Sequence, residues 1–214
     1  MTITYPLPTS FFDEFPGWTT EFEPMWRQEY SRTAGGQTIA KDLGSPLWKM
    51  TAQSKSLRPN ELDYWRARIM SLEGVLKTFR AFPKSRCYPI AYPNGSWPTG
   101  GSFGGDCELT TINANRKSIS LHDLPVGYRV SVGDYIQIGA NDLHMVMEPA
   151  IADASGYTSQ FEVRPHLWPG VTAPRAVALV KPSCVMRLVA GSVSTTSDKE
   201  TGRAVISFQA IEAR

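Results

Sequence analysis

Short apolar segments separated by turn-forming residues run through most of this sequence and limit what it can fold into. The chain holds 16 Pro and 17 Gly in 214 residues, and these interrupt nearly every candidate strand after a few positions. Strand-like stretches are expected at 22–32, 37–40, 47–55, 118–121, 135–138, 144–148, 160–164, 184–190 and 204–211. The pattern predicts a mainly β protein.

One segment has helical periodicity instead. Its apolar side chains recur at spacings of three and four residues and would form one stripe, in the order Leu62, Trp65, Ile69, Leu72 and Leu76. Proline and acidic residues mark its start, and Pro83 marks its end. The sequence therefore predicts one principal α-helix over about 58–82 that lies on a β core, with Gly74 marking a break or a close contact.

Two proline-rich stretches, PKSRCYPIAYPNGSWP and HLWPGVTAP, divide the chain. Between them, the hairpin-like joints GAND and ADASGY connect a compact group of strands. We therefore predict an inserted small β-domain, a barrel or sandwich, over 86–171. The outer domain, a β-sandwich or split barrel carrying the helix, would combine 1–85 with 172–214.

Composition argues against several classes of protein. The net charge is +2 and no block of like charges occurs, so no specific nucleic-acid binding is predicted. No apolar run approaches the length of a membrane span, and no signal peptide is recognisable. The three cysteines form no C-x-x-C pair, which favours free, buried thiols in a reducing cytoplasm: Cys87, Cys107 and Cys184.

The letters TGGSFGGDC contain the pattern G-x-S-x-G, with Ser102 in the position of an esterase nucleophile. Asp123 or Asp134 with His144 or His166 could complete a triad in chain order. However, no apolar strand precedes the serine and glycines stand where a helix should begin. We expect a loop serine and no enzyme, and we keep a serine esterase or glycan-acting enzyme that uses Ser102 as an alternative.

Other candidate chemistry is equally weak. The histidines are evenly spaced without a local metal-binding pair, so no metal is predicted at His122, His144 and His166. Two carboxylate pairs occur in turns, where acids form local hydrogen bonds: Asp106 with Glu108, and Asp134 with Asp142. No phosphate-binding loop is recognisable, so no cofactor is predicted.

The N-terminal segment is rich in aromatic residues and is interrupted by proline and glycine. Aromatic side chains in an irregular arm suit docking on a neighbouring subunit, because they bury much area at little entropic cost. Packing on the chain's own core explains them equally well. The candidate assembly residues are Phe11, Phe12, Phe15, Trp18 and Trp26.

Four segments together resemble a known family: NELDYWRARIMSLEGVLKTF, LPVGYRVSVGDYIQIGANDLHMV, GYTSQFEVRPHLWPG and VALVKPSCVMRLV. The chain is similar over about 55–190 to the distal tail proteins of long-tailed, non-contractile phages and phage-like gene transfer particles. The most specific part is VGDYIQIG together with FEVRPHLWPG.

The resemblance implies a hexameric ring at the tail tip of the virion, assembled in the cytoplasm of the host bacterium. Such a ring contacts the tail tube protein, the hub and the tail fibre proteins, and DNA passes through it. The family also implies that an aromatic residue of the inserted domain, such as Trp97 or Trp168, could stack on a host-surface saccharide. Another tail part, such as a tube, neck or completion protein, is the main alternative.

Overall fold

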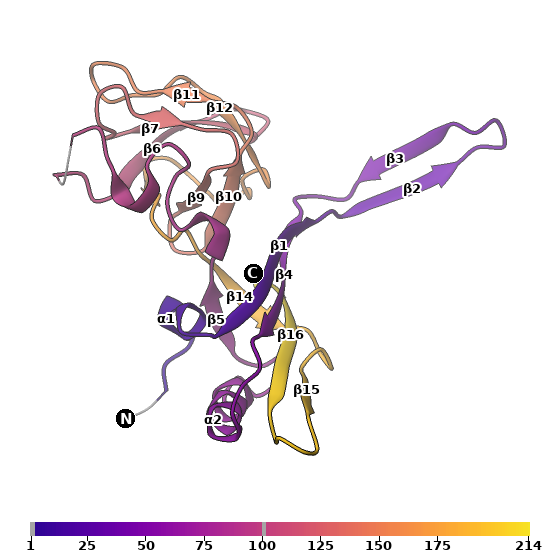
Figure 1. Cartoon of the computed structure of the whole chain (residues 1–214). Coiled ribbons are helices and arrows are strands. Elements are labelled where there is room, and N and C mark those ends of the chain that lie inside the picture. Colours follow the sequence, from indigo (N-terminus) through magenta and orange to yellow (C-terminus); the bar gives the residue numbers. More distant parts are fainter. Residues whose placement is uncertain (1–2, 100–101) are drawn as a thin grey trace.

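The computed structural model describes residues 3–99 and 102–214 of a mainly β protein with two helices (Figure 1). Its larger parts are an antiparallel sheet and a closed six-strand β-barrel. In the chain, the barrel is inserted between β5 (Thr78–Ala81) and β14 (Cys184–Leu188), which are neighbours in the sheet. The predicted fold class, mainly β with one principal helix and an inserted small barrel, is confirmed.

The sheet has the order β1–β4–β16–β14–β5, and β15 pairs with β16. The remaining strands are β1 (Gly17–Met25), β4 (Leu47–Ser54), β15 (Ser194–Ser197) and β16 (Ala204–Glu212). Buried and partly exposed side chains alternate along β16, as expected of a strand with one face on a core. This face of the sheet contributes buried side chains to the first hydrophobic core, among them Met50 and Ala52 of β4 and Phe208 and Ala210 of β16.

The principal helix, α2 (Pro59–Met70), is shorter than predicted. The side chain of Glu61 accepts a hydrogen bond from the backbone N–H of Arg58 at 3.0 Å and caps its start. Its buried stripe includes Leu62, Trp65 and Ile69. The helix ends because Glu73 and Gly74 take positive φ angles of 50° and 66°, which an α-helix cannot continue through.

The predicted end at residue 82 is therefore wrong. Leu76, which the sequence placed on the apolar stripe, lies beyond the helix and is 70% exposed. The following residues form β5, whose Phe79 and Ala81 are fully buried in the sheet. Apolar spacing alone could not separate one long helix from a shorter helix followed by a turn and a strand.

The barrel closes in the order β10–β12–β7–β6–β13–β9 around a second hydrophobic core. Its strands are β6 (Asp106–Ile112), β7 (Ser118–His122), β9 (Tyr135–Ile138), β10 (Asp142–Val146), β12 (Phe161–Arg164) and β13 (Arg175–Ala178). The short strands β8 (Arg129–Val130) and β11 (Ala150–Ile151) form a separate pair. Because β13 belongs to the barrel, the barrel extends past residue 171, where the sequence placed the end of the insertion.

Several elements differ from the strands expected from the sequence. The stretch 22–32 is not one strand but parts of β1 and of β2 (Gln28–Arg32). The short elements η1 (Lys84–Arg86), η2 (Pro93–Gly95) and α1 (Thr9–Asp13) were not expected, and neither were β5, β6, β13 and β15. Local signals for them are weak; β15, for example, has the polar sequence STTS.

Candidate assembly surface

A two-stranded arm projects from the sheet, away from both cores (Figure 1). It consists of β2 and β3 (Thr38–Asp42), which pair only with each other among the described residues. In the chain, β2 follows β1 and β3 precedes β4, so the arm extends the hairpin that β1 and β4 form inside the sheet. A strand rise of about 3.4 Å per residue gives the arm a reach of roughly 20 Å.

Every residue of β2 and β3 is exposed. Tyr30 lies opposite Ala40, and Ile39 lies opposite Ser31. Because successive side chains of a strand point to opposite faces, Tyr30 and Ile39 lie on different faces of the arm. The large apolar side chains in and beside the arm have exposed fractions of 54% for Trp26, 75% for Tyr30, 56% for Ile39 and 51% for Leu43.

An isolated two-stranded hairpin is at best marginally stable in water. The base of this arm is fixed by a hydrogen bond of 2.8 Å from the N–H of Leu43 to the carbonyl of Arg27. At the tip, the N–H of Thr33 donates to the carbonyl of Gln37 at 2.9 Å. With exposed apolar side chains on both faces, the arm is a candidate for contact with another surface.

The N-terminal aromatic residues divide into two groups, and this corrects the prediction of one aromatic assembly arm. Phe11, Phe12 and Phe15 are 1%, 0% and 2% exposed, because they pack inside the first core of their own chain. Their side chains are not available to a neighbouring subunit. Trp26 is exposed beside the projecting arm, and the side chain of Trp18 lies outside the described part of the chain.

Sequence reasoning missed three members of this surface, namely Tyr30, Ile39 and Leu43. A signal existed in the stretch QEYSRTAGGQTIAKD, where a glycine turn separates two short strands whose side chains are mostly polar. A hairpin with so few apolar residues has little side-chain surface to bury in a core. This composition could therefore have indicated a projecting arm.

Ser102 lies in an exposed loop that leads into the barrel. The strand β6 begins four residues later, where a nucleophile elbow would have a helix. Among the described residues, no hydrogen bond links Ser102 to a histidine or a carboxylate; Gly100 and Gly101 of the motif lie outside them. The neighbouring Phe103 instead packs its ring 5.1 Å from that of Trp97 and 5.9 Å from that of Tyr128.

The other candidate residues are dispersed. His144 is fully buried, whereas His122 stacks on Tyr157 at a ring distance of 3.9 Å. In the described ranges, no group of three His, Cys, Asp or Glu side chains could hold a metal ion. Asp134 has a structural role, because it accepts hydrogen bonds from the N–H groups of Ile90 and Ser131 at 2.7 and 2.8 Å.

The remaining candidates have local roles or positions as well. Asp106 and Glu108 both lie on β6, and Asp142 forms an ion pair with Arg214. Of the tryptophans considered for saccharide stacking, Trp97 is only 9% exposed, and the guanidinium of Arg214 covers the ring of Trp168 at 4.5 Å. Trp97 is thus nearly enclosed, and one face of the Trp168 ring is occupied by Arg214.

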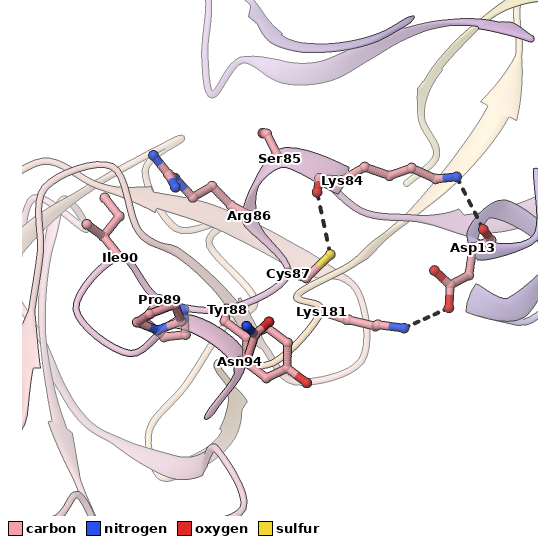
Figure 2. Close-up of a pocket in the computed structure, with 11 residues that line it drawn as sticks. Asp13, Lys84, Ser85, Arg86, Cys87, Tyr88, Pro89, Ile90, Asn94 and Lys181 are labelled. Carbon is pink, nitrogen blue, oxygen red and sulfur yellow. Dashed lines mark hydrogen bonds and ion pairs between the residues drawn. The ribbon is translucent and has the colours of Figure 1, made fainter. Parts of the chain in front are cut away.

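A polar cleft of about 480 Å³ lies beside α1, where Lys84 and Lys181 reach toward Asp13 (Figure 2). Lys181 forms an ion pair of 2.7 Å with the Asp13 carboxylate, and Lys84 donates to the backbone carbonyls of Asp13 and Phe15 at 3.2 and 2.8 Å. Burial lowers the pKa of Lys84 and raises that of the Cys87 thiol. These cations fasten the end of α1, and Cys87 is not an activated nucleophile.

No helix of the described residues combines the length and the apolar character needed to cross a membrane. No known protein-family model matches the sequence, and no curated protein matches it significantly.

Proposed function

We propose that this chain is a structural component of a phage tail tip. It assembles into a ring, hexameric as the family resemblance implies, that joins the tail tube to the hub and the fibres. The observation that carries the proposal is the exposed arm formed by β2 and β3, with apolar side chains on both faces. The arm contributes nothing to either core of its own chain, and contact with another molecule would cover its exposed apolar side chains.

The arm offers the kind of contact that the ring implied by the family resemblance needs. An arm that reaches roughly 20 Å from the sheet can meet a surface different from its own on the next copy. Such head-to-tail contacts generate a closed ring when the rotation between copies closes. A net charge of +2 without basic clusters is compatible with a lumen through which DNA passes without being held.

The assembly proposal is tested by the mass of the full-length chain in solution. Multi-angle light scattering over a range of concentrations should give a species of about six chains. A variant in which the four apolar arm residues are replaced, Trp26→Ser, Tyr30→Ser, Ile39→Ser and Leu43→Ser, should stay folded and lose this assembly.

The matched control replaces apolar residues that are equally exposed but lie on the barrel: Val126 (62%), Val132 (54%) and Ile151 (60%). Changing these three to Ser should leave the assembled mass unchanged. A wild-type chain that stays monomeric at high concentration contradicts the proposal, and so does an arm variant that assembles as well as the wild type.

A further inference from the structure

The base of the arm, the end of β16 and one loop of the barrel meet in a buried polar junction. Ser45, 5% exposed, donates from its hydroxyl to the carbonyl of His166 at 2.8 Å. The indole N–H of Trp48 donates to the carbonyl of Leu143 at 2.7 Å. The first bond runs to the barrel from the segment between β3 and β4, and the second runs to the barrel from the start of β4, so the chain next to the arm is connected to the barrel directly.

A cluster of charges crosses the same junction. Arg214 forms one ion pair with Asp142 of β10 and another, at 2.6 Å, with Glu212 of β16. The second oxygen of Glu212 accepts the backbone N–H of Trp48 at 3.0 Å. Arg214 also covers the ring of Trp168. The charged cluster therefore links the sheet, the barrel and the start of β4.

His144 lies on β10, two residues after Asp142, and is completely buried. Its Nδ1 is 2.7 Å from the carbonyl of Pro165, so Nδ1 carries the proton and donates. Its Nε2 has no hydrogen-bond partner among the described residues. Three charged or titratable groups face His144: Asp142 on its own strand, Arg214 after β16, and His166 in the loop after β12. His166 in turn faces Asp42 of the arm.

We propose that this junction is an acid-released latch: protonation of His144 at Nε2 frees the barrel loop 165–168 from the arm base while the sheet stays folded. A second proton on the ring would place a charge at a buried Nε2 that has no hydrogen-bond acceptor among the described residues, close to the Arg214 cation. Opening the loop lets water reach the ring. The barrel then loses its fixed orientation relative to the arm.

The sign of the acid response follows from the two buried groups. Burial lowers the pKa of His144 to about 4 from 6.5, so the open state binds the proton more readily and acid favours opening. Burial raises the pKa of Glu212, so proton uptake there favours the closed state and does not cause opening. With its pKa at about 4 when closed and 6.5 when open, titration of His144 alone increases opening about 30-fold between pH 7.5 and pH 5, and proton uptake by Glu212 offsets part of this rise.

Amide hydrogen exchange of the full chain, corrected for the intrinsic rate at each pH, tests the latch. The reporter amides are Trp48, bonded to Glu212, and Leu167, bonded to the carbonyl of Arg116 at 2.8 Å. Their opening should rise at pH 5, by at most about 30-fold. The amide of Ile206, bonded to Ser54 at the far end of the sheet, should not change.

The variant His144→Asn can still donate to the carbonyl of Pro165 but does not titrate, and it should lose the acid response. His122→Asn, at the barrel surface, should keep it, and His166→Asn should keep most of it. The latch is contradicted if the wild type shows no rise, if His144→Asn keeps the rise, or if Ile206 opens in parallel.

A second variant covers the case in which His144→Asn does not fold. Arg214→Met removes the cation that holds the charged cluster together, and it should raise amide exchange at Trp48 and Leu167 already at pH 7.5. The control Arg203→Met changes an exposed residue and should leave the exchange at both amides unchanged. Unchanged exchange in Arg214→Met contradicts the latch. The latch does not depend on ring formation, so it can fail while the assembly proposal stands, and the reverse also holds.

Discussion

Replacement of Phe15 by alanine separates core packing from assembly in the N-terminal aromatic segment. The Phe15 ring lies 5.3 Å from Trp65 of α2 and 5.3 Å from Phe208 of β16, and it is 2% exposed. Truncating a buried phenylalanine removes its transfer free energy and leaves a cavity, at a cost of about 3–5 kcal/mol. Because a chain of this size loses about 2–4 °C per kcal/mol, the melting temperature should fall by about 10 °C.

The assay is urea unfolding of the dissociated monomer, followed by circular dichroism. Phe15→Ala should lower the midpoint with an unchanged m value. The control is Trp26→Ala, which removes a side chain 54% exposed and should change the free energy of unfolding by less than about 0.5 kcal/mol. A Phe15→Ala protein as stable as the wild type would refute the core packing described above, and a large loss in Trp26→Ala would show that the arm packs on its own chain.

Three further outcomes are expected. Gly105→Ala should lower the free energy of unfolding, measured in urea, by about 2–4 kcal/mol, because φ is +90° and the new Cβ would lie 2.4 Å from Val180 Cγ2. The control Gly127→Ala has open space around its Cβ and should lower the free energy of unfolding by only about 1 kcal/mol. Equal losses in the two variants would contradict this prediction. Asp134→Ala should lower the free energy of unfolding by about 2–4 kcal/mol in thermal unfolding, because it leaves the backbone N–H groups of Ile90 and Ser131 without their acceptor. An unchanged stability would argue against these two bonds. Ser102→Ala and the wild type should hydrolyse a chromogenic ester equally, at background rate; serine-dependent turnover would favour the esterase alternative.

The sequence predicted the fold class because its two signals are physically strong. Turn residues limit strand length, and the stripe from Leu62 to Ile69 needs a helix with one buried face. The end of that helix depended on two residues at positive φ, Glu73 and Gly74, which periodicity does not register. The strand expected at 135–138 coincides with β9, since its apolar residues are bounded by turns on both sides.

The assembly surface was predictable only in part. An aromatic residue in an irregular segment packs equally well on its own core or on a neighbour, and only the fold decides between the two. Phe11, Phe12 and Phe15 pack on the core of their own chain, whereas Trp26 is exposed. The junction at His144 could not be predicted at all, because it depends on contacts between β10, the end of β16 and the start of β4, which are far apart in the sequence.

The central claim, that the arm joins copies of this chain into a closed ring, is tested most directly by electron microscopy of the purified full-length chain. We predict closed rings with a central opening and an arm of each copy lying on the next. The variant with four serines in the arm should give only single particles. Two-fold dimers, open filaments, or rings that form equally well without the apolar arm residues would contradict the account.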